Sequence, residues 1–505
     1  MASEAITYAT MTWQEQLPVL QVLVPFVAAP LLVTIGHKGL AWPLTMLASA
    51  ISLIVSALLL AQVIDGSVIS YRLGGWAPPL GIEYRVDAAN AFVLFLVSAI
   101  ATLVLAYARA SVAAEIPREK HTLFYTAFLL CLTGLLGVTI TGDAFNVFVF
   151  LEISSLSTYV LIAEGAHRDK RALTAAYDYL IMGTIGATFF VIGIGFLYMA
   201  TGTLNIADLA ERLSTQTDSR TVRAGFAFVV VGIGLKVAIY PLHLWLPRAY
   251  TFAPSVVSVF LAATATKVAI YVLLRFMFTV FKPAFLFELQ TLEFIILPFA
   301  VIAMFAASFI AIFQSDFKRL LAYSSIAQIG YMLLGIAFLS STGLTATIVH
   351  LFNHGITKAA LFMAVGAYAL RAGGSFMDNI AGAGRTMPWT SAAVVIAGLS
   401  LIGVPGTAGF ISKWVLVQAA LEKGWWPVAI LIVASSLLAV IYVWKVIEAL
   451  YLAKPLEGGA TREAPLSMVI PTWIAALASI WFGFSTGVTL EAAEAAANGL
   501  MNGVR

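Results

Sequence analysis

The sequence predicts an all-α polytopic membrane protein with about 14 transmembrane helices, and three observations support this class. Hydrophobic residues make up 61% of the 505-residue chain and charged residues only 10%, whereas a soluble domain is typically about 25% charged. The apolar residues form continuous runs of about 20 residues, which is the length that spans a bilayer. Because these runs do not alternate with polar residues, they exclude a β-barrel. The composition also excludes a soluble globular enzyme, a disordered protein and a coiled coil.

Charges, glycines and prolines separate the apolar runs and mark the expected helix ends. The expected spans are 17–36, 40–62, 88–108, 122–140, 145–163, 177–200, 224–241, 255–279, 291–313, 320–340, 345–370, 390–420, 426–451 and 468–487. Residues 63–87 alternate β-branched and polar side chains and contain Gly-Gly and Pro-Pro, which predicts a small external hairpin or cap. Residues 204–213 have apolar positions at helical spacing, which predicts a short surface helix.

Basic residues predict the orientation, because cytoplasmic loops carry an excess of Lys and Arg. The odd-numbered loops contain 14 of them: Lys38, Arg109, Arg118, Lys120, Arg168, Lys170, Arg171, Arg248, Lys318, Arg319, Arg371, Arg385, Lys454 and Arg462. The even-numbered loops contain 7: Arg72, Arg85, Arg212, Arg220, Arg223, Lys282 and Lys423. The odd loops are therefore expected in the cytoplasm. With an even number of helices, both termini are expected on the external, periplasmic side of the cell (inner) membrane.

Two of the expected spans combine a lysine with helix-breaking residues close to it. The segment GLKVAIYPLHLWLP includes Pro241, and GVPGTAGFISKW includes Pro405 and Gly406. A proline inside a helix removes a backbone hydrogen bond and clashes with the preceding turn. Interrupted spans at corresponding places in two halves are typical of transporters with inverted repeats. The two spans lie five helices apart, as the seventh and the twelfth, which predicts two repeats of five helices.

Among the ionisable residues within the apolar spans, seven are candidates for a functional role: Glu152, Lys236, Lys267, His350, His354, Lys358 and Lys413. On insertion scales each charge at the bilayer centre costs about 2.5–3.5 kcal/mol, so these residues are expected to have partners or water inside the bundle. Burial disfavours the charged form of an ionisable group and an opposite charge favours it, so a buried carboxylate–lysine pair can act as a proton switch. Glu152 and Lys236 are candidates for such a role. The alternatives are a carboxylate satisfied by Ser and Thr near a helix end, and a lysine that reaches the membrane interface.

His350, His354 and Lys358 are spaced i, i+4 and i+8, so they share one face of a helix. Histidine titrates near neutral pH and a desolvated lysine can release its proton, so a proton could move along this stripe through water. The alternative is a polar seam that holds two helices together. A zinc site at the two histidines is disfavoured, because the intervening residues lack the glutamate of the HExxH motif. Lys413 follows the Pro-Gly break, where unwound backbone exposes carbonyl groups that can bind water.

Other kinds of site find no support in the sequence. The single cysteine, Cys131, excludes a disulfide framework, an iron–sulfur cluster and a cysteine-based zinc site. The chain has no P-loop, no GxGxxG before a helix and no CxxCH motif. No catalytic residue, metal site or cofactor is therefore expected, and no basic block is long enough to suggest binding to nucleic acid.

Two long stretches resemble the signature segments of a known superfamily. They are PLHLWLPRAYTFAPSVVSVFLAATATKVAIY (241–271) and DFKRLLAYSSIAQIGYMLLG (316–335). Both resemble the antiporter-like, proton-conducting membrane subunits, which include large subunits of Mrp-type cation/proton antiporters and antiporter-like subunits of respiratory complex I. The resemblance covers about residues 85–450. It implies helices 1–3 with an external loop in 1–120, a first five-helix repeat in 121–280, a second in 281–452, and helix 14 with a tail in 453–505.

The resemblance also implies roles for the membrane-embedded residues. Glu152 and Lys236 match the carboxylate–lysine pair of a first half-channel, and Lys267 matches the connecting lysine of the next helix. Pro241, Pro405 and Gly406 match the helix breaks.

In the second half-channel, His350, His354 and Lys358 match the polar run of the eleventh helix, and Lys413 matches the terminal residue. A lysine rather than a glutamate at 413 is closer to the D subunit of Mrp antiporters. The resemblance thus implies a proton-translocating subunit of a multisubunit monovalent cation/proton (Na+/H+) antiporter, which moves protons through a relay of these residues and water.

Two alternatives to this function stay open. The chain could be a proton-pumping subunit of a complex I-like NADH:quinone oxidoreductase or of a membrane-bound hydrogenase. It could also be a structural membrane subunit with an inactive channel, although the retained lysines argue against that. In each case the chain is not expected to be an enzyme by itself. The expected partners are other membrane subunits, protons and Na+, and the lipid bilayer.

Overall fold

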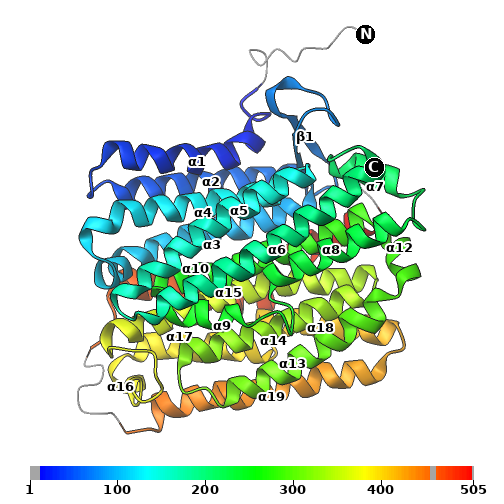
Figure 1. Cartoon of the computed structure of the whole chain (residues 1–505). Helices are drawn as coiled ribbons and strands as arrows, with labels where there is room; N and C mark the ends of the chain where they lie inside the picture. The colour runs from blue at the N-terminus through cyan, green and yellow to red at the C-terminus, as the bar shows by residue number, and fades with distance from the viewer. Residues whose placement is uncertain (1–11, 455–461, 503–505) are drawn as a thin grey trace.

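In the computed structural model, which describes residues 12–454 and 462–502, most residues belong to helices that run side by side in one bundle (Figure 1). The hairpin of β1 (Ile69–Arg72) and β2 (Glu83–Val86) lies at one end of the bundle, with the short helices α7 (Ile206–Leu213) and α12 (Lys282–Leu289). Helix α16 (Ala383–Thr386) lies at the opposite end. These two ends are named the hairpin end and the α16 end.

The other α-helices make up the body of the bundle. In chain order they are α1 (Leu17–Ile35), α2 (Ala41–Val63), α3 (Ala88–Glu115), α4 (His121–Ile140), α5 (Ala144–Ala163), α6 (Arg171–Thr201), α8 (Arg220–Val237), α9 (Trp245–Phe252), α10 (Ser255–Ala263), α11 (Ala265–Leu274), α13 (Leu297–Ile312), α14 (Phe317–Ala337), α15 (Ser341–Arg371), α17 (Pro388–Ile402), α18 (Ala408–Glu422), α19 (Trp426–Tyr451), α20 (Leu466–Phe484) and α21 (Gly487–Asn502). Two π-helical turns, Arg275–Val280 and Leu292–Ile296, precede α12 and α13.

The all-α multi-pass class is confirmed. Among the residues that the structure describes, 12 helices are long and apolar enough to cross a membrane. The other two expected spans are the ones with the predicted breaks. Helix α8 has three basic residues in 18 and is followed by a break and then α9, and the span 390–420 is divided into α17 and α18. The count of 14 spans depends on these two broken helices and stays a prediction.

The predicted hairpin and surface helix are both present. Strands β1 and β2 pair antiparallel, with Ile69 opposite Val86. The buried carboxylate of Glu83 accepts hydrogen bonds from Ser70 Oγ (2.5 Å) and from Asn205 Nδ2 (2.7 Å). Because Asn205 is also the N-cap of α7, the contact with Glu83 fixes the hairpin to that helix.

Two groups of helices repeat the same order of lengths. Helices α4, α5 and α6 have 20, 20 and 31 residues, and α13, α14 and α15 have 16, 21 and 31. In each group an aspartate caps the second helix, Asp143 for α5 and Asp316 for α14. Each aspartate also forms a β-bridge with the chain after the third helix, at Asn205 and Phe376 respectively. The first bridge lies at the hairpin end and the second at the α16 end, as an inverted repeat requires.

The two predicted breaks lie where the sequence places them. Residues 238–244, which include Pro241, and residues 403–407, which include Pro405 and Gly406, are not helical. Gly406 has a φ of +84°, a conformation that residues with a side chain adopt only under strain. A third interruption, at Thr264 between α10 and α11, falls inside the expected span 255–279 and was not predicted.

The C-terminal helices differ from the expected single span and tail. Helix α20 ends inside the bundle, beside the break between α17 and α18: a Cβ on Gly483 would lie 2.5 Å from the carbonyl oxygen of Gly406. Helix α21, which was not predicted, packs on α15 and α3 and continues toward the hairpin end. There Ser341 Oγ donates a hydrogen bond to Asn498 Oδ1 (2.6 Å). Helix α20 therefore covers only part of the length of the bundle, and α21 covers the rest as far as the hairpin end.

The orientation can be tested with reporter fusions. Arg171 and Arg319 line one cavity at the α16 end, so both positions must report the same side of the membrane. Because the loops at this end hold twice as many basic residues, we expect fusions after Arg171 and after Arg319 to report cytoplasm. A fusion after Lys282, at the hairpin end, should report the external side. An external signal at Arg171 or Arg319 would overturn this orientation.

Candidate functional site

Glu152 and Lys236 lie next to each other on α5 and α8. Glu152 Oε1 is 3.8 Å from Lys236 Nζ, which is an ion pair but not a direct hydrogen bond. Lys236 Nζ instead donates to Ser155 Oγ (2.5 Å), about one turn after Glu152 on α5. Glu152 Oε1 is buried and accepts no hydrogen bond from the described residues. The lysine thus has two partners within reach, one charged and one neutral.

The local structure around Lys236 explains why it can hold this position. It lies in the last turn of α8, whose end is capped by a hydrogen bond from Trp245 Nε1 to Leu235 O (2.9 Å). A cavity of about 40 Å³ borders Lys236 and Ser155, which is enough room for a water molecule. On the α6 side, Lys236 faces Gly183. A Cβ at that position would lie 3.5 Å from Lys236 Nζ, so the glycine leaves more space for the lysine side chain to move.

Lys267 lies just after the unpredicted break at Thr264. It is 1% exposed, and its Nζ donates to the carbonyl oxygen of Ala262 and to Thr266 Oγ1 (3.4 Å). In an unbroken helix the carbonyl of Ala262 would accept from the backbone N–H four residues later. The interruption therefore supplies the acceptor for the lysine. Within the described chain Lys267 makes no hydrogen bond to Lys236 or Lys358, so any proton transfer between them needs water.

The stripe of His350, His354 and Lys358 lies on a single helix, α15, and all three side chains are buried. Lys358 Nζ donates to the Leu321 carbonyl oxygen (2.7 Å) and to Ser324 Oγ, both on α14. At the other end of the stripe, His350 Nδ1 lies 2.8 Å from Ser412 Oγ on α18.

Between them, His354 has no hydrogen-bond partner on either ring nitrogen among the described residues. Its ring is parallel to that of His350, with the centroids 6.1 Å apart. The stripe therefore links α14 to α18 and leaves free nitrogen atoms in its middle.

Lys413 reaches back across the second break. Its Nζ donates to the carbonyl oxygens of Leu401 (3.2 Å) and Ile402 (2.8 Å) at the end of α17, and it lies 4.8 Å from the centre of the Tyr331 ring. Leu401 is the residue before the last in α17, as Lys236 is in α8. The two lysines are therefore on opposite sides of their breaks in sequence, yet both amino groups lie at the end of the helix that precedes the break.

Several hydroxyl groups in these contacts were not singled out from the sequence. Ser155, Ser324 and Ser412 each contact a residue of the proposed relay. Ser412 directly precedes Lys413, and Ser155 follows Glu152 by three residues, which are the only sequence signals for them. Ser324 contacts Lys358 only because α14 packs against α15, so no local pattern could have identified it.

The chain is similar to several known proteins. The family described as NADH:quinone oxidoreductase/Mrp antiporter, TM matches residues 141–439, a range that includes both breaks and all seven ionisable residues. The N subunit of NADH-quinone oxidoreductase from Desulforudis audaxviator is 39% identical and covers 92% of this chain and 95% of its own length. The D subunit of the Na(+)/H(+) antiporter from Alkalihalophilus pseudofirmus is 31% identical and covers 85% and 86%. A chain in the structure of the Mrp complex from Dietzia sp. superposes with a TM-score of 0.89 at 26% identity, over 97% of this chain and 98% of that one.

Proposed function

Because the chain belongs to the NADH:quinone oxidoreductase/Mrp antiporter transmembrane family, we propose that it is the proton-translocating subunit of a multisubunit monovalent cation/proton (Na+/H+) antiporter. The main support is the loose Glu152–Lys236 pair, whose 3.8 Å separation leaves the lysine free to exchange partners. A pair held only for stability would gain from direct hydrogen bonds between the two charges.

The proposed relay begins at this pair. When Lys236 leaves Glu152 for Ser155, it loses the charge that stabilises its protonated form and can release a proton. When the pair re-forms, the lysine is protonated again. The proton passes through water to Lys267, then to the stripe on α15, and leaves through Lys413. In this scheme the carbonyl groups at the Thr264 break and at the end of α17 hold the two buried lysines without neutralising them.

Three further features belong to this proposal. The two repeats occupy 121–280 and 281–452, flanked by an N-terminal unit in 1–120 and a C-terminal unit in 453–505. Both chain ends lie on the external side. The chain catalyses no chemical reaction by itself, and the energy for transport comes from an ion gradient.

A second candidate function has one observation in its favour. The identity with the N subunit of NADH-quinone oxidoreductase, 39%, is higher than that with the D subunit of the antiporter, 31%. In this case the same relay would work within a redox-driven complex, and the electrons would move through partner subunits.

Purification of the tagged chain from native membranes tests the choice between them. We expect it to co-purify with several small membrane subunits, and the reconstituted complex should couple a Na+ gradient to proton movement. The measurements are mass spectrometry of the partners and a pH-sensitive dye in proteoliposomes. Partners that contain iron–sulfur clusters or flavin, together with no response to Na+, would contradict the antiporter and support the redox complex.

A further inference from the structure

A cavity of about 410 Å³ lies at the α16 end and includes none of the seven residues of the proposed relay. At about 30 Å³ per water molecule, it has room for several. Its charged lining residues are Glu115, Arg168, Asp169, Arg171, Asp316, Lys318 and Arg319. Three of them, Glu115 (8% exposed), Asp316 (8% exposed) and Lys318 (6% exposed), are buried, whereas Arg171 and Arg319 are exposed. The cavity thus connects the surface with three buried charges.

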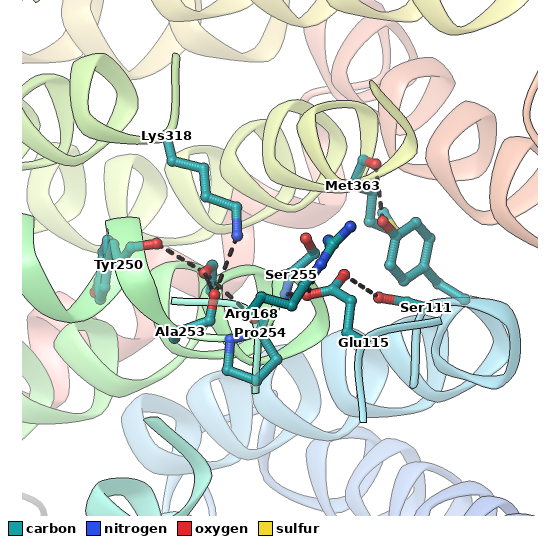
Figure 2. A network of polar contacts seen from close by, with 11 residues as sticks. Ser111, Glu115, Arg168, Tyr250, Ala253, Pro254, Ser255, Lys318 and Met363 are labelled. Atoms are coloured by element: carbon teal, nitrogen blue, oxygen red, sulfur yellow. Dashed lines mark hydrogen bonds and ion pairs between the residues drawn. The ribbon is translucent and has the colours of Figure 1, made fainter. Parts of the chain in front are cut away.

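Glu115, the last residue of α3, is held in place by groups from two other parts of the chain and from its own helix (Figure 2). Its Oε2 accepts from the backbone N–H of Ser255 (2.9 Å), and its Oε1 accepts from Ser111 Oγ (3.1 Å). Arg168 Nη1 is 3.9 Å from Oε2, a distance that leaves the guanidinium outside hydrogen-bond range. The carboxylate is therefore fixed, desolvated and only loosely paired.

Two sets of polar contacts connect helices that line the cavity with α15. On α14, Lys318 Nζ donates to the Ala253 carbonyl oxygen (3.1 Å), and one turn further along the Leu321 carbonyl oxygen accepts from Lys358 Nζ (2.7 Å). The helix that lines the cavity thus also holds the inner end of the stripe.

On α3, Ser111 lies one turn from Tyr107, whose hydroxyl donates to the Met363 carbonyl oxygen on α15 (3.1 Å). Beside it, the buried Ser255 Oγ has no hydrogen-bond partner among the described residues. Both sets of contacts therefore reach α15 between Lys358 and Met363.

The geometry points to this cavity as the proton-uptake vestibule at the α16 end, with Glu115 as the group that takes protons from it and passes them toward Lys358. This assignment rests on the proposed function and adds a second entry to its relay: protons from Glu115 join the stripe at Lys358, those from the Glu152–Lys236 pair join it through Lys267, and transport needs both. A hydronium ion in the cavity gives its proton to the Glu115 carboxylate and becomes water; the neutral carboxyl group then passes the proton through water to the unprotonated amine of Lys358, which becomes an ammonium group while Glu115 returns to a carboxylate.

Several elements place polar groups around Glu115. Its own helix α3 contributes Ser111 and Tyr107, α10 contributes Ser255, and the segment after α5 contributes Arg168. Helix α14 contributes Lys318, which also interacts with Asp316.

The simpler alternative is that Glu115 only caps the N-terminus of α10 through the Ser255 N–H. Glu115→Gln distinguishes the two roles, because glutamine keeps a carbonyl oxygen for that N–H but cannot carry a proton. If Glu115 is only a cap, the variant should transport like the wild type at every pH. If Glu115 takes up protons, flux should fall at least about tenfold and lose its dependence on the pH of the α16 side.

Chemical labelling tests the vestibule in a complex that is already folded. Ser375 lines the cavity, and the chain's one native thiol, Cys131, is fully buried. We expect Ser375→Cys, modified from the α16 side with a membrane-impermeant, positively charged methanethiosulfonate, to lose proton flux. The matched control is Glu119→Cys, at an exposed position of the same end outside the cavity, which should keep its flux when labelled. The labelled wild-type complex corrects for thiols of partner subunits.

The outcomes separate this inference from the proposed function. Lys236→Ala is measured in the same vesicles, normalised to assembled complex. If Lys236→Ala is inactive while Glu115→Gln and the labelled Ser375→Cys transport like the wild type, the vestibule is overturned and the relay stands. If Lys236→Ala also keeps its flux, the proposed function fails, and the vestibule fails with it.

Discussion

Replacing Lys413 with arginine is expected to reduce proton flux to background even though the positive charge is kept. Arginine has a pKa above about 12 and cannot release a proton at working pH, whereas a buried lysine can. Lys413 contacts two carbonyl oxygens and the face of an aromatic ring, all of which a guanidinium could also contact, so the loss would come from the proton and not from the charge. Lys413→Ala should likewise be inactive. Lys413→Glu should keep part of the flux with an altered pH optimum, because a carboxyl group can also titrate.

Lys445 provides the matched control for this experiment. Its Nζ also donates to two backbone carbonyl oxygens at the end of a helix, those of Ile312 and Gln314 (both 2.9 Å), but it lies outside the proposed relay. Lys445→Arg should therefore transport like the wild type. Flux is measured in inverted vesicles and normalised to assembled complex. Wild-type flux in Lys413→Arg would remove this residue from the relay and leave the second half-channel without its terminal group.

Glu152→Gln and Lys236→Ala are each expected to abolish transport in a complex that still assembles. Either change removes one partner of the pair that starts the relay, so the proton affinity of the lysine can no longer be switched. Breaking a buried ion pair can cost about 3–5 kcal/mol in a dry core. Here the cost to stability should be smaller, because the Glu152 side chain is 26% exposed and a cavity borders Lys236.

The surface pair Arg223–Glu288, with 3.1 Å between its charged atoms, is the control for the loss of an ion pair as such. Glu288→Gln should leave flux unchanged, since exposed pairs contribute little. Assembly is checked by co-purification of the partner subunits. Full transport by an assembled Glu152→Gln complex would reduce the Glu152–Lys236 pair to a structural contact.

Features that depend on local chemistry could be predicted from the sequence. The helices follow from continuous apolar runs, and the two breaks follow from Pro241 and from Pro405 with Gly406. The spacing of His350, His354 and Lys358 was enough to place them on one face of one helix. The interruption at Thr264 could not be predicted in this way, because no proline or glycine marks it. Its energetic support comes from a lysine side chain that binds a freed carbonyl group.

Features that depend on packing between distant segments were not visible in the sequence. Glu115 lies two residues before Pro117 at a helix end, where a charged residue usually faces water. It is buried because Ser255 and Arg168 come from other segments to contact it. Helix α21 has acidic residues and few large apolar ones, so it resembles a polar tail, but four alanines, Ala492, Ala493, Ala496 and Ala497, are buried within the bundle. The contact between Lys413 and the end of α17 also requires the three-dimensional course of the break.

The position of α20 has a consequence for how the protein is made. Its end packs against Gly406, and Phe482 stacks edge-on against Phe352 of α15, with the ring centroids 5.0 Å apart. Every residue of the proposed relay precedes α20 in the chain, so the ribosome delivers all seven titratable groups before the helix that packs behind the second break. A nascent chain inserted only as far as α19 would hold a full set of titratable groups beside an uncovered stretch of unwound backbone. Insertion of α20 and α21 is thus the step that closes the wall of the second half-channel, and a membrane that must hold a proton gradient depends on this step being completed.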